Sequence, residues 1–274
     1  MSDWFQIKEV KEDIFCIEEP GHVQSYLING KTHSALIDTG MGFCDIRTAI
    51  EPLLQEQVIV LNTHWHFDHI GGNPLFEEIG IARNEDGLIA RNIPNAVLMD
   101  LYVNPCLLEG VPFPAHFNPA AYAIQGSKPS FFISQGDHFD LGDRALEAIA
   151  TPGHTRGSMS FLDEQTGSLF SGDFIYPGSI YAHFTDSDTE QYVESLNKIW
   201  HHHQTFDSIF GAHNEYPVPR SYIRDVKEGF DKINNKTISP ITIGDWGEPV
   251  HCYQLGEINI LTKIPGSKGI QLFA

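Results

Sequence analysis

The sequence predicts a mixed α/β protein built from two successive halves, each with a sheet and helices. Short runs rich in Ile, Val, Phe and Tyr, bounded by turn residues, open the chain and start again near residue 138; such runs are typical of strands. Apolar residues at helical spacing follow the strands, at 45–54 in the first half and at 189–200 and 222–233 in the second. Sheets with helices on their outer faces, in two similar halves, favour a four-layer αββα sandwich.

The first half begins with four short strands, expected at residues 4–10, 13–18, 24–29 and 34–38. Turn residues such as Pro20-Gly21 separate them. A helix over 45–54 comes next, and the unbroken apolar run at 58–61 predicts a strand that is buried on both faces. This strand ends at Asn62-Thr63, directly before a cluster of histidines.

The second half repeats the pattern without a short-period repeat. The expected strands cover 138–141, 145–150, 159–162, 168–170 and 208–210, and the two helices and a strand-rich tail complete the chain.

Charge and composition exclude several classes of protein. The formal net charge of −19, with no cluster of Lys or Arg, argues against nucleic acid as a partner because the phosphate backbone is also negative. No apolar run is long enough to span a membrane, and the start of the chain, Met1 to Trp4, shows no signal-peptide pattern. The cysteines are scattered and form no CxxC pair, so we expect a reducing, cytoplasmic environment; they are Cys16, Cys44, Cys106 and Cys252.

A cluster of metal-ligand residue types occupies the loop after the buried strand. The segment His64-Trp65-His66-Phe67-Asp68-His69 places three imidazoles and a carboxylate within six residues. Nitrogen and oxygen ligands of this kind suit zinc. In a tight loop His64 and His66 can point to the same side, while Asp68 and His69 reach a second position. The alternative is a histidine-rich surface loop without a metal.

Four more candidates lie in glycine-containing loops, each directly after a predicted strand: Asp38, His154, Asp173 and His213. Such loops deliver side chains into the crevice at the strand ends, where open α/β sheets bind ligands. The second half is therefore expected to contribute to the same kind of site.

The order of the motifs LIDTG, THWHFDH, TPGHTRGS, SGD and GAHN resembles that of the metallo-β-lactamase superfamily, over residues 38 to 213. The resemblance implies the metallo-β-lactamase fold, the αββα sandwich already favoured. It also implies a ligand set: His64, His66 and His154 for one metal, Asp68, His69 and His213 for the other, and Asp173 bridging them with a water or hydroxide. Asp38 would orient the histidine loop from behind the ligands.

Two departures narrow this resemblance. The β-lactamases of this superfamily lack the bridging aspartate that Asp173 would provide, so β-lactam hydrolysis is not expected to be the main activity. Flavodiiron relatives carry a glutamate where His66 stands, which argues against a di-iron oxygen reductase. We expect two divalent ions, zinc first, although histidine and carboxylate ligands also accept iron or manganese.

The resemblance implies hydrolysis by a metal-bridging hydroxide, since two cations that share a water lower its pKa to about 7. Asp68 is expected to ligate a metal and to accept a hydrogen bond from the hydroxide. Tyr176 lies three residues after Asp173, a spacing at which related acyl-homoserine lactonases carry a tyrosine that donates to the substrate. The alternative is a partly buried loop tyrosine. Tyr181 and His183 are candidates for the wall of the substrate pocket.

Residues 93–132 form a proline-rich and aromatic insert in what is otherwise expected to be one domain over 1–274. Long irregular segments are usually functional covers or linkers, and this one is too apolar for a linker. We expect a cover over the active site, with a structural or dimer-forming role as the alternative. Acidity, an apolar cover and Tyr176 together favour a small, uncharged substrate with an apolar part: a carboxylic ester, a lactone or a thioester.

Other activities remain open at this point. A hydroxyacylglutathione thioesterase would need basic residues, and Arg220 and Arg224 are available but are expected to be solvated helix charges. A phosphodiesterase would use the same ligands, with Arg156 near the phosphate. A persulfide dioxygenase would use one iron held by two histidines and an aspartate. A non-catalytic binding protein is the least supported, because all seven ligands are present.

Two other histidine features carry no metal prediction. His22 lies in a hairpin turn and is expected to be solvated. His201, His202 and His203 are adjacent at a helix end, where their side chains would point in different directions.

Overall fold

The computed structural model describes residues 4–202 and 204–272. The chain divides into two compact units, Met1–Glu147 and Ala148–Ala274, and the boundary falls within strand β9 (Ala145–Ala150). Among the described residues, no helix is both long enough and apolar enough to cross a membrane. One domain over 1–274 stays a prediction.

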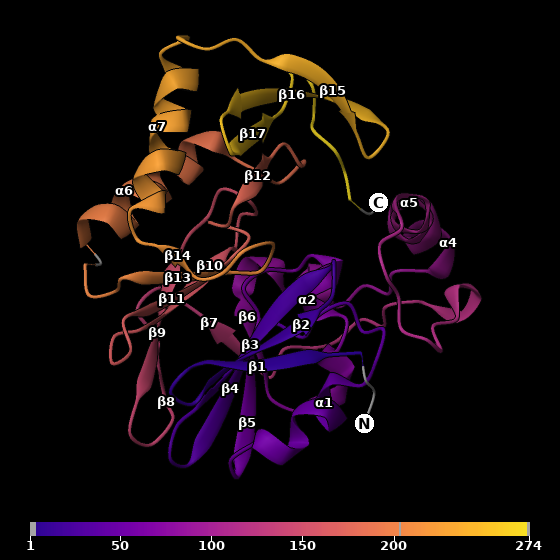
Figure 1. The fold of residues 1–274 in the computed structure, drawn as a ribbon, viewed down its shortest axis with the longest axis vertical. Helices are drawn as coiled ribbons and strands as arrows, with labels where there is room; N and C mark the ends of the chain where they lie inside the picture. Colours follow the sequence, from indigo (N-terminus) through magenta and orange to yellow (C-terminus); the bar gives the residue numbers. More distant parts are fainter. Residues whose placement is uncertain (1–3, 203, 273–274) are drawn as a thin grey trace. The chain divides into compact units, whose positions relative to one another are not determined.

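The first unit is organised around a seven-stranded sheet whose strands follow one another in chain order (Figure 1). They are β1 (Gln6–Lys11), β2 (Ile14–Glu19), β3 (Val23–Asn29), β4 (His33–Ile37), β5 (Gln57–Leu61), β6 (Ile79–Ala82) and β7 (Phe131–Ile133). The first four strands pair antiparallel, and the pairs from β4 to β7 are parallel. The five predicted strands correspond to β1–β5, and the sequence pattern missed β6 and β7.

Strand β7 corrects the prediction that the insert is irregular up to residue 132. Phe131 pairs with Gly80 of β6, and a Cβ at Gly80 would lie only 2.2 Å from the Phe131 ring. The pairing therefore depends on a glycine about fifty residues upstream, which local patterning around Phe131 does not reveal.

Helix α1 (Ile46–Ile50) covers one face of this sheet, where Ile46 and Ile50 pack with Leu27, Leu36 and Val60 in a buried cluster. The side chain of Asp45 caps its N-terminus, in the way that helix starts prefer. The remaining short helices before the insert are η1 (Glu51–Leu53), α2 (Phe67–Ile70), η2 (Asn73–Leu75), η3 (Arg83–Glu85) and α3 (Asp86–Ile89).

The insert is helical in its first half. It contains α4 (Asn95–Leu98), the π-helix η4 (Met99–Val103), α5 (Asn104–Glu109) and the single turn η5 (Pro119–Ala121). The helical run therefore extends from Asn95 to Glu109. A backbone bridge between Ile93 and Ile124 closes the insert at its base. After it, β8 (His138–Asp140) pairs with the start of β9.

The second unit contains two sheets and two long helices (Figure 1). One sheet has the order β14-β13-β11-β10-β9-β8, where β8 is the strand already placed beside the start of β9. The other sheet has the order β12-β17-β16-β15. The strands not yet placed are β10 (Met159–Asp163), β11 (Ser168–Gly172), β12 (Gly178–Ala182), β13 (Ser208–Gly211), β14 (Val218–Pro219), β15 (Ile241–Asp245), β16 (Glu248–Leu255) and β17 (Ile258–Thr262).

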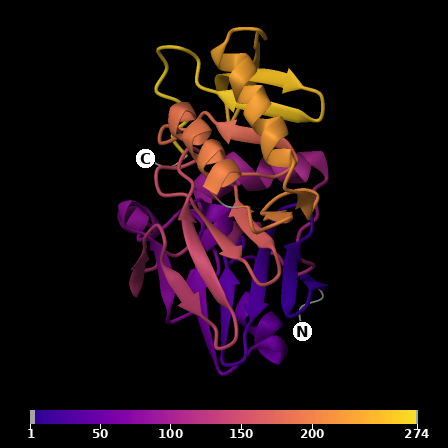
Figure 2. The same ribbon diagram turned by 90° about the vertical axis from the view of Figure 1, so that its left-hand side faces the viewer.

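The helices of this unit are α6 (Thr189–His202) and α7 (Tyr222–Asn234), and they lie side by side (Figure 1 and Figure 2). Their apolar faces enter one core with strands of both sheets. Both helices were predicted from the spacing of apolar residues. The histidine run at 201–203 reaches beyond the described residues, because His203 and the side chain of His202 lie outside them. The predicted mixed α/β class is confirmed.

Candidate metal centre

The first unit contributes four of the predicted ligands from one loop. Strand β5 ends at Leu61, and the chain crosses the loop to begin α2 at Phe67. The imidazoles are buried, and the Asp68 side chain keeps 16% exposure; the four candidates are His64, His66, Asp68 and His69. His69 Nε2 lies 3.5 Å from Asp68 Oδ2, so these two side chains converge.

Asp38 braces this loop from below. It follows β4 with a left-handed backbone (φ 59°), a conformation that aspartate tolerates better than most residues. Its Oδ1 accepts from the Thr63 backbone N–H at 2.8 Å, and its Oδ2 accepts from the Thr63 hydroxyl at 2.7 Å and from His69 Nδ1 at 2.8 Å. One buried carboxylate therefore fixes both the loop backbone and an imidazole.

These bonds also fix which nitrogens are free to ligate. Because the Asp38 carboxylate only accepts, His69 Nδ1 carries the proton and its Nε2 holds the lone pair. The Thr63 hydroxyl donates to Asp38, so its oxygen accepts from His64 Nδ1, 3.0 Å away. His64 therefore also presents Nε2 as a neutral donor atom, the form that binds metals.

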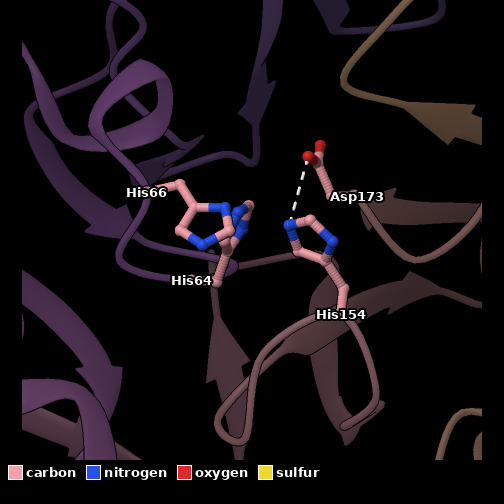
Figure 3. A group of neighbouring side chains, drawn as sticks. All are labelled: His64, His66, His154 and Asp173. Carbon is pink, nitrogen blue, oxygen red and sulfur yellow. Dashed lines mark ion pairs between the residues drawn. The ribbon is translucent and has the colours of Figure 1, made fainter. Parts of the chain in front are cut away.

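The second unit contributes three predicted ligands from three loops. His154 follows β9, Asp173 follows β11, and His213 follows β13. Strands β11 and β13 are parallel and pair Gly172 with Gly211, so the residues beyond their ends meet at one edge. His213 Nε2 lies 3.1 Å from Asp173 Oδ1. His154 Nε2 lies 3.4 Å from Asp173 Oδ2, and Figure 3 marks this pair with a dashed line.

His154 is oriented by the backbone. Its Nδ1 donates to the carbonyl oxygen of Tyr181 at 2.8 Å, so Nε2 is again the lone-pair nitrogen. Histidines that ligate metals commonly donate their other N–H to a carbonyl or carboxylate. His69 and His154 have this arrangement, whereas His64 donates to the Thr63 hydroxyl. Together with the carboxylates, these imidazoles make the donor set chemically fit for zinc or a similar divalent ion.

The predicted substrate residues lie close to these ligands within the second unit. Tyr176 is buried, and its ring meets the His213 ring edge-on with centroids 5.3 Å apart. Tyr181 contributes its carbonyl to His154, and its ring contacts His183. His183 is fully buried, and its Nε2 lies 2.7 Å from Asp245 Oδ2 at the end of β15. Sequence patterning gave no signal for Asp245, because it lies about sixty residues after His183 in the sequence.

Two polar residues near the start of the first unit were not recognised from the sequence. His22 is not the solvated turn residue that was expected: it is buried, it hydrogen-bonds within the insert, and burial lowers its pKa. Glu19 is buried and accepts from Trp4 Nε1 at 2.9 Å and from the Met41 N–H at 2.6 Å. Burial raises the pKa of Glu19 to about 7. Both flank Pro20-Gly21, which resembles an exposed turn when tertiary contacts are unknown.

The basic residues considered for anionic substrates have different surroundings. Arg156 is exposed. Arg220 is not a solvated helix charge: it donates to the Trp200 carbonyl at 2.6 Å, and its guanidinium lies 4.4 Å from the Trp200 ring centroid. Arg224 is exposed, as expected.

Comparison with known proteins identifies the family. Residues 19–201 match the model of the metallo-β-lactamase superfamily. The chain is 27% identical over 214 residues to the acyl-coenzyme A thioesterase MBLAC2 of Homo sapiens, covering 72% of this chain and 76% of that protein. It is 29% identical over 147 residues to a hydroxyacylglutathione hydrolase of Rippkaea orientalis (strain PCC 8801 / RF-1), covering 52% and 45%.

Solved structures share the fold. The sec-alkylsulfatase Pisa1 from Pseudomonas sp. has a TM-score of 0.66 at 15% identity, covering 85% of this chain and 42% of that one. The DIM-1 metallo-β-lactamase has a TM-score of 0.61 at 13% identity, covering 85% and 99%. These likenesses confirm the predicted metallo-β-lactamase fold, and the names of the curated relatives confirm the prediction of a hydrolase. The chain belongs to the metallo-β-lactamase superfamily.

Proposed function

We propose that the protein is a dinuclear metal-dependent hydrolase of acyl thioesters. Two groups of side chains that could each hold a metal ion support this proposal: His64, His66, His154 and Asp173 make one group, and Asp68, His69 and His213 make the other. Asp173 presents one carboxylate oxygen to His154 and the other to His213, which suits a ligand shared by two ions. The observation that carries the proposal is this complete set of imidazoles and carboxylates.

The relatives favour a thioester over the other acyl substrates. The human relative, matched over most of both chains, is an acyl-coenzyme A thioesterase by name. The bacterial relative is named for hydroxyacylglutathione, which is also a thioester. Esters and lactones share the carbonyl chemistry and become comparison substrates in the test below.

Two bound divalent ions would lower the pKa of a shared water to about 7 and supply a hydroxide nucleophile at neutral pH. Asp68 is the most exposed of the four ligands in its loop, and its carboxylate would accept a hydrogen bond from the attacking oxygen. The hydroxyl of Tyr176 would donate to the substrate oxygen as negative charge develops on it. Tyr181 would contribute to the wall on the same side, and the fully buried His183, whose ring contacts the Tyr181 ring, would support that wall.

The insert at 93–132 would cover the site and accept the apolar part of the substrate. Two contacts support this role within the first unit. The Tyr102 ring meets the Phe67 ring at 5.1 Å, and the Tyr122 hydroxyl donates to the Met41 carbonyl at 2.7 Å. Phe67 stands between the candidate ligands His66 and Asp68, so the insert rests against the ligand loop.

Further properties belong to the same proposal. Zinc is the first choice of metal, with iron or manganese as alternatives. None of the four cysteines, which all lie among the described residues, forms a disulfide, and this fits the expected cytoplasmic setting. The net charge of −19 favours a small-molecule partner over nucleic acid. A homodimer formed through the insert is a further possibility that gel filtration would test.

Thiol release by zinc-loaded protein tests the proposal. The substrates would be acyl-coenzyme A and S-acylglutathione thioesters, with lactones, esters and phosphodiesters as comparison. Replacing Asp173 with Ala should lower thioester turnover by more than about 100-fold, beyond the loss typical of an outer partner of a ligand, and should lower metal content. Asp225→Ala, at an exposed position on α7, is the matched control and should change neither.

Each other outcome overturns part of the proposal. Full activity and metal content in Asp173→Ala would exclude the dinuclear site. Turnover of lactones or phosphodiesters, with no activity on thioesters, would show that thioesters are not the substrate class. One bound iron with oxygen uptake would replace hydrolysis by persulfide oxidation.

A further inference from the structure

His22 joins the β2–β3 turn to two separate points of the insert. Its Nδ1 lies 2.6 Å from the Tyr102 hydroxyl, and its Nε2 lies 2.6 Å from the Pro112 carbonyl oxygen. Tyr102 belongs to the π-helix η4, whereas Pro112 follows α5. A single ring therefore bridges the middle of the helical part of the insert and the segment that follows it.

The partners determine the protonation of this ring. The Pro112 carbonyl can only accept, so Nε2 carries the proton and donates to it. Nδ1 of the neutral ring then accepts from the Tyr102 hydroxyl. A rigid imidazole that donates on one side and accepts on the other suits both partners at once, which makes His22 hard to replace by another residue type.

An aromatic cluster surrounds the two hydrogen bonds. The His22 ring lies 5.0 Å from the Phe43 centroid, 5.0 Å from the Phe113 centroid and 5.8 Å from the Trp4 centroid. Phe113 also stacks on Phe117 at 4.7 Å. Both hydrogen bonds are partly buried, and hydrogen bonds that are shielded from water are electrostatically stronger than exposed ones.

The turn itself is shaped for close approach of the insert. Gly21 has φ +78°, and a Cβ there would lie 3.1 Å from Val111 Cγ1 and 3.3 Å from Pro112 Cδ. Any other residue would be strained and would push against the insert. The tight contact and the two hydrogen bonds of His22 therefore act at the same place.

We propose that His22 is a positioning residue that locks the insert, residues 93–124, against the loop of metal-ligand residues. Tyr102, held by His22, presses its ring on Phe67 between His66 and Asp68. A locked insert gives the substrate pocket a wall of fixed shape. Such a wall discriminates among acyl chains of different length, because each methylene that is buried changes the binding affinity by about fourfold. This last consequence rests on the proposed thioesterase function, whereas the lock itself does not.

Amide hydrogen exchange of the metal-loaded protein tests the lock directly. His22→Ala should speed exchange in residues 93–124 by about tenfold or more, the effect expected when two hydrogen bonds are lost, while β3 and β4 keep their protection. Tyr102→Phe keeps the ring contacts and removes one bond, so it should give a smaller increase in the same segment. His116→Ala, an exposed histidine of the insert, is the matched control and should change nothing.

The second measurement is kcat/KM on acyl thioesters with short, medium and long chains. Release of the insert should reduce the ratio between the best and the worst chain length by about fivefold or more in His22→Ala, at unchanged metal content. Unchanged exchange in both His22→Ala and Tyr102→Phe would overturn the lock, and Tyr102→Phe decides alone if His22→Ala does not fold. Faster exchange with an unchanged ratio would overturn the role in selectivity. Because exchange needs no substrate, an enzyme that cleaves no thioester would refute the proposed function and leave the lock to be judged separately.

Discussion

The two units hold their candidate ligands by different means. In the first unit four ligands lie within six residues of one loop, and a side chain, Asp38, braces that loop through Thr63 and His69. In the second unit three ligands come from three loops, and the backbone places them. Pairing of Gly172 with Gly211 sets Asp173 beside His213, and the Tyr181 carbonyl orients His154.

The difference decides which substitutions can disturb each set. A brace made by one side chain is lost in a single substitution, which leaves its hydrogen-bond donors without their acceptor. A brace made by strand register and a carbonyl persists through most side-chain changes and yields only when the backbone is displaced. The candidate ligands of the first unit should therefore be sensitive to a side-chain substitution at Asp38. Those of the second unit should be sensitive to substitutions that displace the backbone.

The largest expected effect concerns Tyr176 in the second unit. Its substitution distinguishes a role in the reaction from a role in packing only. Tyr176→Phe keeps the ring beside His213 and removes the hydroxyl. If the hydroxyl donates to the substrate oxygen, kcat should fall by about 10- to 1,000-fold with metal still bound. Steady-state kinetics with metal analysis checks this. An unaffected rate would leave Tyr176 a packing residue only.

The second effect tests the side-chain brace. Asp38→Asn tolerates the same left-handed backbone but replaces one accepting oxygen by a donor, so metal affinity should fall by about 10- to 100-fold. Tyr181→Phe is the matched variant of the second unit, and it should retain affinity because its carbonyl, not its hydroxyl, holds His154. Competition with a metal chelator measures both. Equal losses in the two variants would contradict the distinction between the braces.

The third effect tests the backbone brace. A Cβ at Gly211 would lie 2.6 Å from Tyr176 Cβ and 2.7 Å from the Ile175 carbonyl oxygen, so Gly211→Ala should destabilise the protein by about 1–3 kcal/mol. Gly244→Ala, in strand β15 where nothing lies within 4 Å of the added Cβ, should have little effect. Denaturant unfolding provides the measurement. Identical stability of the two variants would contradict this prediction, because it would show that the backbone at the end of β13 can shift to accommodate the added Cβ.

Prediction from sequence succeeded where the chemistry is local. The histidine loop, the capped helix at 45–54 and the helices near 189–200 and 222–233 are encoded by neighbouring residues, so spacing alone locates them. Strand β7 was missed because its pairing depends on Gly80, which is far away in the sequence. His22 and Glu19 were misjudged or overlooked for the same reason, since their partners lie in the insert, at Trp4 and at Met41.

The sequence by itself determined the family, the candidate ligands and the order in which strands deliver them, because each motif is a short run after a strand. Only the tertiary structure decided which nitrogen of His64, His69 and His154 can ligate, since each proton is fixed by a partner that is set by the fold. It also decided that His22 is buried rather than solvated. Burial and hydrogen-bond partners come from segments that are distant in the sequence, and a local pattern does not contain them.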